Sequence, residues 1–243
     1  MSAAAVLPLS ILGVGCTAID LSHDLNDKTV CWPGDVAFSL CLHAGADAEG
    51  HHYAGGSFAC SEHSGTHIDA PFHFCASGAT VEQLPIDDLI APCSVIDVTQ
   101  QCAVDAGRAI SAADILGDEA VHGVLPRGSI VLFRTGWARL HWAGGATEYL
   151  GYRATDAVGG FTLCFPGLGL DACDLLIERG VRGVGLDTAS LDAGACTSFD
   201  AHRRLLGAGV FGIENISASI HSLPPRGATL IALPLRIAGG SGA

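Results

Sequence analysis

Five short apolar runs, each bounded by turn-forming residues, limit the fold of this chain more than any other feature. They lie at residues 93–98, 129–134, 183–187, 210–214 and 229–235. Runs of this length and bulk are typical of buried strands. Helical patterns lie between some of them, at residues 111–118, 171–179 and 199–206. Strands dominate the first third and strand–helix alternation follows, which predicts a single mixed-sheet domain of the α/β class.

The helical segments carry signals for their own ends. Ser111 is followed three residues later by Asp114, the spacing of a capping box. Asp171 is placed to cap the second helix and Gly180 to end it, and Gly207 ends the third. These signals support helices at the three positions.

Composition excludes several classes of protein. With 12 basic and 25 acidic residues the net charge is −13, so clustered positive charge for nucleic-acid phosphates is not expected. No apolar run reaches 18 residues, so we expect no membrane span. Residues 1–18 form an apolar lead-in without the positive start of a signal peptide, and residues 19–243 form the expected domain. None of the ten cysteines forms C-x-x-C, and we expect mostly buried thiols in a cytoplasmic protein.

The most informative segment is His63-Ser-Gly-Thr-His-Ile-Asp-Ala-Pro-Phe-His73. Glycine, threonine, isoleucine and proline disfavour a helix here, so an extended segment is expected. His63, His67, Asp69 and His73 then share one face, because side chains alternate along a strand. Pro71 should end or bulge the strand. Imidazoles and a carboxylate on one face are good ligands for zinc or manganese.

A second cluster lies downstream. His202 falls in the helix at 199–206, and Glu214 ends the apolar run at 210–214. A carboxylate at the end of a buried strand needs a partner, since an uncompensated buried charge is costly. A metal ion would supply that partner, although such a residue can also be the first solvated position after the strand.

The segment 63–73 resembles the H-x-G-T-H-x-D-x-P-x-H signature of the cyclase family, which contains bacterial-type kynurenine formamidases and isatin hydrolases. Further segments resemble the family's motifs in the same order: Asp20-Leu-Ser22, Trp32-Pro-Gly-Asp35, Gly185-Leu-Asp-Thr-Ala-Ser-Leu-Asp192, the His202 and Glu214-Asn215 region, and Ala232-Leu-Pro-Leu235. The resemblance runs from about Asp20 to the C-terminus. It implies the family's swivelling β/β/α-like fold and a homodimer.

The resemblance also implies a role for each site residue. Its metal ligands would be His63, His67, Asp69, His202 and Glu214, binding one or two Zn²⁺ or Mn²⁺ ions. Asp69 and Glu214 would bridge to the second ion. His73 would be the general acid/base and Trp32 would line the pocket for a small aromatic amide. We also expect Thr66 and Asn215 to orient the ligands, because they flank them.

Three functions are compatible with these residues. The presence of Glu214-Asn215 favours hydrolysis of N-formylkynurenine, because the isatin-hydrolase branch typically uses one manganese ion and lacks the downstream glutamate. The alternatives are an isatin hydrolase-like opening of a cyclic amide or lactone, and a non-catalytic metal-binding protein of the same fold. Residues 137–165 match no motif. Residues 239–243 stand where the family usually continues into a last strand, so we expect either a truncated C-terminus or an unpaired edge of the sheet there.

Overall fold

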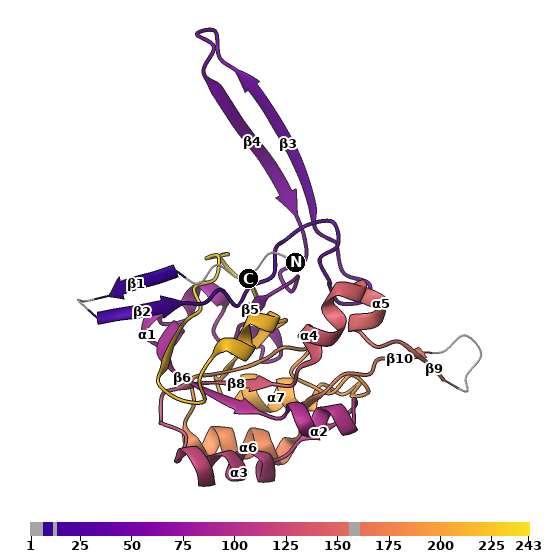
Figure 1. The fold of residues 1–243 in the computed structure, drawn as a ribbon. Coiled ribbons are helices and arrows are strands. Elements are labelled where there is room, and N and C mark those ends of the chain that lie inside the picture. Colours follow the sequence, from indigo (N-terminus) through magenta and orange to yellow (C-terminus); the bar gives the residue numbers. More distant parts are fainter. Residues whose placement is uncertain (1–6, 12–13, 156–160) are drawn as a thin grey trace.

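The computed structural model describes residues 7–11, 14–155 and 161–243. Within these residues, six strands form the central sheet (Figure 1). In spatial order they are β14 (Ala228–Ile231), β6 (Ile90–Asp97), β8 (Ile130–Arg134), β12 (Gly183–Leu186), β13 (Phe211–Glu214) and β5 (His67–Asp69). The four central strands are parallel, and the two outer strands run antiparallel to their neighbours. The predicted mixed-sheet α/β domain is therefore confirmed.

Two apolar layers cover the two faces of this sheet. Strand β8 shows the division, because Val131 and Phe133 face one layer while Ile130 and Leu132 face the other. The first layer is made by the longer helices, which lie together below the sheet in Figure 1. They are α2 (Thr99–Val104), α3 (Ala112–His122), α6 (Leu170–Arg179) and α7 (Asp200–Gly207). The second layer includes the short helices α1 (Ile86–Leu89), η2 (Val81–Gln83) and η4 (Ala218–Ser222).

The predicted strands and helices are present, but several of their ends differ; β6 begins earlier, at Ile90, and α3 continues to His122. The run at 229–235 is a strand only as far as Ile231, because the chain then leaves β6 and the amide of Ala232 bonds to Leu89. Gly169, and not Asp171, is the N-cap of α6. The Asp171 carboxylate instead accepts the amide of Ala112 at the start of α3, so it joins two helices.

Several small two-stranded sheets lie outside the central sheet, and all but the parallel pair of β7 (Ala109–Ile110) with β11 (Gly167–Leu168) are hairpins. Strands β1 (Leu7–Ile11) and β2 (Val14–Ala18) form one within the expected lead-in, of which residues 1–6 and 12–13 lie outside the described residues. Strands β3 (Ser39–Ala46) and β4 (His52–Ala59) form a longer one that projects from the body (Figure 1). The remaining hairpin is β9 (Arg153–Ala154) with β10 (Phe161–Thr162).

Residues 137–165 fold over one end of the domain, except 156–160, which lie outside the described residues. They contain α4 (Trp137–His141), η3 (Trp142–Gly144) and α5 (Gly145–Tyr149). The indole of Trp137 donates to the carbonyl of Tyr149, and the Tyr149 hydroxyl donates to the carbonyl of Asp187. This segment thus anchors to the loop that follows β12.

The C-terminal residues correct the expectation of an unpaired edge. The amide of Ile68 donates to Ala243, the amide of Ala243 donates back to Ile68, and the amide of Ala70 donates to Ser241. The tail therefore covers the outer side of β5.

Two further expectations concern burial and membranes. All ten cysteines lie in the described part of the chain, but only Cys93, Cys102, Cys164 and Cys173 are buried, so the prediction of mostly buried thiols is wrong. Among the described residues, no helix combines the length and apolarity needed to cross a bilayer.

Candidate metal centre

The centre forms where β5 pairs with the end of β13. The antiparallel register sets Glu214 opposite His67 and Gly212 opposite Asp69. His67 and Asp69 are two residues apart on β5, so both side chains point to the same side. Glycine suits position 212, because a Cβ there would lie 3.2 Å from that of Asp69. The carboxyl end of β13 and the edge strand thus bring one imidazole and two carboxylates together.

His67 is fixed in one orientation at this point. Its Nδ1 donates to the carbonyl oxygen of Gly65 at 2.9 Å. Its Nε2 then faces the two carboxylates, 3.2 Å from Asp69 Oδ1 and 3.6 Å from Glu214 Oε2. This buried Nε2 has no aligned hydrogen bond with any described residue. A ring nitrogen and two carboxylates that point at one place can together coordinate a cation there.

His202 approaches the same carboxylates from α7. Its Nε2 lies 3.0 Å from Glu214 Oε1 and 3.2 Å from Asp69 Oδ2. Its Nδ1 lies 2.6 Å from the carboxylate of Asp192, which also accepts the amide of Ala201 at the start of the helix. Asp192 therefore fixes both the helix end and the imidazole. It was part of a recognised motif, but a sequence gives no sign that its carboxylate turns back to a histidine ten residues later.

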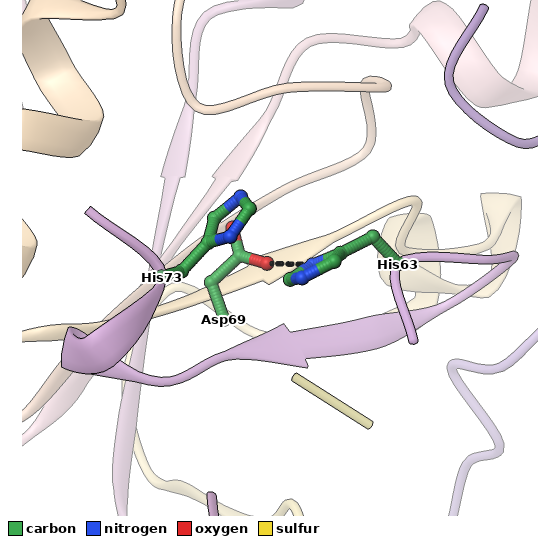
Figure 2. A group of neighbouring side chains, drawn as sticks. All are labelled: His63, Asp69 and His73. Carbon is green, nitrogen blue, oxygen red and sulfur yellow. Dashed lines mark hydrogen bonds and ion pairs between the residues drawn. The ribbon is translucent and has the colours of Figure 1, made fainter. Parts of the chain in front are cut away.

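His63 and His73 complete the cluster. The prediction that the whole segment is extended is wrong in part, but the predicted end of the strand at Pro71 is confirmed. Only residues 67–69 are strand. Gly65 adopts a left-handed φ of 63° in the preceding turn, and residues 71–73 form the 3-10 helix η1 (Pro71–His73). These two bends still direct both rings toward Asp69 (Figure 2). His63 Nδ1 lies 2.7 Å from Asp69 Oδ1, and the His63 and His73 rings stack at 3.9 Å.

The charges in this cluster shift its titration strongly. Burial opposes protonation of His67, but Asp69 and Glu214 overcome it and raise the pKa of His67 to about 9. Burial would raise the pKa of Asp69, yet hydrogen bonds with His202 and His63, together with the charge of His67, hold it well below its usual range. Burial and the nearby Asp69 raise the pKa of Glu214. Buried carboxylates of this kind need compensating positive charge.

His73 titrates in the opposite direction. Burial, together with the neighbouring imidazoles of His63, His202 and His67, lowers its pKa to about 4 against the opposing effect of Asp69. Its imidazole is therefore neutral near pH 7 and able to accept a proton.

Among the described residues, three groups of side chains have a donor set for a divalent ion; one of them, Asp47, Glu49 and His51, is exposed in the loop between β3 and β4, and the other two lie in this centre. Of these two, the first is His67, Asp69 and Glu214, and the second is His63, Asp69 and His73; within each group the ligand atoms lie within 4.8 Å of one another. Asp69 belongs to both. Nitrogen and carboxylate ligands suit zinc and manganese. The buried Nε2 of His67, which has no aligned hydrogen bond with a described residue, shows that this donor set suits such an ion.

A cavity of about 290 Å³ opens onto this cluster. Its polar wall includes His63, His73, His202 and Glu214, and its apolar wall includes Trp32, Phe74 and Phe199. This volume is near the lower end of small-molecule sites, which span roughly 300–1,000 Å³. The cavity therefore has the size and lining for one small aromatic compound.

Thr66 and Asn215 support the turn before β5. The Thr66 hydroxyl donates to the Asn215 carbonyl at 2.6 Å, and the Asn215 side-chain amide donates to the carbonyl of Gly65 at 2.8 Å. That same carbonyl accepts His67 Nδ1. The two flanking residues thus hold the group that orients His67.

The fold and the imidazole–carboxylate cluster beside an aromatic cavity define an α/β domain with a candidate metal-dependent active site. A profile of the family described as "Putative cyclase" matches residues 19–193, and the chain belongs to this family. It is 34% identical over 204 residues to an isatin hydrolase of Roseibium aggregatum, covering 81% of this chain and 74% of the relative. It is 30% identical over 225 residues to a kynurenine formamidase of Salinibacter ruber, covering 93% of each.

Solved structures agree with this assignment. Isatin hydrolase A from Labrenzia aggregata, bound to benzyl benzoate, superposes with a TM-score of 0.82 at 31% identity, covering 93% of this chain and 90% of that one. An isatin hydrolase bound to the product analogue thioisatinate gives the same TM-score at 29% identity, covering 93% and 88%.

Proposed function

We propose that this chain is a metal-dependent hydrolase that cleaves the C–N bond of a small aromatic amide, with N-formylkynurenine as the favoured substrate. The observation that carries the proposal is the buried Nε2 of His67, which faces Asp69 and Glu214 without an aligned hydrogen bond. Two carboxylates and a correctly turned imidazole are a ligand set for a cation. The hydrolase domain in this proposal is residues 19–243.

His63, His67, Asp69, His202 and Glu214 would hold one or two Zn²⁺ or Mn²⁺ ions. Asp69 belongs to both groups of ligand atoms, and its two oxygens face different histidines, Oδ1 toward His63 and Oδ2 toward His202. It is therefore placed to be shared between two ions. When bound, such an ion lowers the pKa of a coordinated water and polarises a carbonyl group.

His73 would move the proton during hydrolysis. With a pKa of about 4 it is neutral near pH 7, so it accepts the proton of the attacking water as the new C–O bond forms. It then returns that proton to the leaving nitrogen as the C–N bond breaks. His73 thus ends the reaction in the neutral form in which it began.

Trp32 would bind the aromatic ring of the substrate. Its indole lies 5.9 Å from the ring of Phe199, and both line the cavity beside His73. Flat apolar walls of this kind favour a planar aromatic group by offset or tilted stacking.

Two observations separate the favoured substrate from its alternative. Glu214 lies inside the cluster, 3.0 Å from His202 Nε2, which favours the two-ion arrangement expected for the formamidase branch. The identity to an isatin hydrolase and the two superpositions at a TM-score of 0.82 favour opening of a cyclic amide. Isatin hydrolysis is therefore the second candidate.

A homodimer is also part of the proposal. Strands β3 and β4 pair over eight residues each, yet Leu40, Leu42, Tyr53 and Phe58 are exposed on them. An isolated two-stranded hairpin is marginal in water. Packing against a second copy would cover these side chains, and light scattering at micromolar concentration should give twice the chain mass of 24.8 kDa. A mass of one chain would contradict the dimer.

The activity is tested by offering N-formylkynurenine and isatin side by side to the metal-loaded protein. We expect hydrolysis of at least one compound, loss on chelation, and recovery on adding zinc or manganese. Compared with the wild type at equal metal content, the His73→Gln variant should lose about 10²–10⁴-fold in rate, the usual contribution of a general acid/base. The exposed His122→Gln serves as the control. Full activity of His73→Gln would contradict the proposed role of His73 in proton transfer. Inactivity of the metal-loaded protein on both compounds would favour a non-catalytic metal-binding protein.

A further inference from the structure

The C-terminal tail contacts the metal centre through a chain of hydrogen bonds that none of the proposed roles uses. The Ser241 hydroxyl lies 2.9 Å from His63 Nε2 and 2.7 Å from the Glu62 carboxylate. The backbone amide of Ser241 donates to the same Glu62 oxygen at 2.8 Å. Glu62, Ser241, His63 and Asp69 thus form one continuous series of polar contacts.

The directions of these bonds follow from the groups involved. A carboxylate only accepts, so the single hydroxyl proton of Ser241 points to Glu62. The Ser241 oxygen is then left to accept a proton from His63 Nε2. This arrangement leaves Nδ1 of His63 directed at Asp69 Oδ1, 2.7 Å away. Two lone pairs would repel at that distance, so a proton or a metal ion must lie near both atoms.

The backbone of the tail is fitted to the same imidazole. A Cβ on Gly242 would lie 2.6 Å from His63 Cε1 and 2.7 Å from the carbonyl oxygen of Ile68, so only glycine fits there. The pairing of Ala243 with Ile68, and of Ser241 with Ala70, holds the tail at this position. The contact is therefore built by the backbone, the absence of a side chain at 242, and the hydroxyl at 241.

We infer that Ser241, held by Glu62, is a positioning residue that fixes His63 with its proton on Nε2 and presents Nδ1 to the metal ion. The inference rests on the proposed metal-dependent function. Metal-bound histidines generally donate their other N–H to such a partner, and loss of the partner weakens metal binding by about 10–100-fold. The C-terminal tail thus helps to orient a ligand of the metal centre.

The same groups also resemble a Ser–His–Asp triad, in which Ser241 would be a nucleophile activated by His63. The hydroxyl proton disfavours that role, because Glu62 already accepts it. The two roles predict different results for one substitution. A nucleophile is needed for turnover but not for metal affinity, whereas a positioning residue is needed for affinity.

The test is zinc affinity of the full chain, measured by competition with a chromophoric chelator. We expect Ser241→Ala to bind Zn²⁺ at least about 10-fold more weakly than the wild type. Ser241→Thr keeps the hydroxyl and should stay close to the wild type. Gly242→Ala should weaken binding independently, by displacing His63. Ser222→Ala, at an exposed serine on η4, is the matched control. The double variant Glu62→Ala/Ser241→Ala should lose no more zinc affinity than Ser241→Ala alone, because Glu62 acts through Ser241.

A second readout tests the tautomer directly. In ¹⁵N-labelled, zinc-loaded wild type, the His63 imidazole should show its proton on Nε2, and Ser241→Ala should perturb that signal. Unchanged zinc affinity in Ser241→Ala, or a proton on Nδ1, overturns the inference while leaving the metal site intact. Lost activity at unchanged affinity would favour the nucleophile and also overturns it. Absence of zinc binding by the wild type would instead overturn the proposed function, and this inference with it.

Discussion

Loading the metal-free protein with zinc should release about one proton or more per ion, because the cluster holds protonated imidazole in place of the metal. The perturbation is titration of Zn²⁺ into the metal-free chain at pH 7.5. The carboxylates of Asp69 and Glu214 raise the pKa of His67 to about 9. At pH 7.5 such a group is ~97% protonated, whereas a histidine of ordinary pKa would be ~9% protonated.

The proton count follows from the need for a neutral imidazole as ligand. His67 alone supplies about one proton per zinc ion. His202 adds up to a second, since hydrogen bonds with Asp192, Asp69 and Glu214 overcome the effect of burial and raise its pKa well above the ordinary value. Zinc affinity should also rise by about tenfold per pH unit for each proton displaced, across the range below pH 9.

Calorimetry in buffers of different ionisation enthalpy measures this count directly. The control is His122→Gln, which removes an exposed imidazole at the end of α3 and should leave the release unchanged. Release of only about 0.1 proton per zinc ion, the value for a histidine of ordinary pKa, would refute the reasoning that the two carboxylates keep His67 protonated.

Three other predictions follow from the same geometry. Asp192→Asn should weaken zinc binding by about 10–100-fold because it disturbs the orientation of His202. The control Asp174→Asn, at an exposed ion pair with Arg204, should bind zinc like the wild type, and equal zinc affinities of the two variants would contradict the role of Asp192. Thermal unfolding of the metal-free protein should show two opposite pH effects. The contribution of His67 is fully present below pH 6.5 and is lost as the pH rises through about 9, whereas the low pKa of His73 destabilises the fold as the pH falls from 6.5 toward 4; a flat profile would speak against both. Gly183→Ala should lower the free energy of unfolding in urea by roughly 1–3 kcal/mol, because its Cβ would lie 2.4 Å from the Phe211 ring. The control is Gly207→Ala, whose Cβ enters open space, and the same urea midpoint for both variants would contradict the tight contact at Gly183.

Much of the fold was predictable because the strands are short, apolar and separated by capped helices. The capping box at Ser111 is present, with the Ser111 amide donating to Asp114. The extended interpretation of 63–73 placed the right residues together for a partly wrong reason. Only β5 follows the alternation, and the turn at Gly65 and the 3-10 helix at Pro71 deliver His63 and His73.

Other features depend on contacts between residues far apart in sequence. Ser241 lies 178 positions from His63, and local pattern gives no sign that the tail crosses the cluster. The pairing of the tail with β5 is equally invisible to periodicity, because Gly-Gly-Ser-Gly has the composition of a loop. Asp192 belonged to a recognised motif, but only the fold shows that it binds His202.

The most direct test of the central claim is metal content by elemental analysis of the purified protein, with His67→Ala and Glu214→Ala beside the wild type. The account predicts about two zinc or manganese ions per wild-type chain, the loss of roughly one in Glu214→Ala, and a severe loss in His67→Ala. One ion per chain that is indifferent to Glu214 would move the assignment to isatin-type chemistry. No metal in any preparation, even after reconstitution, would contradict the metal centre itself.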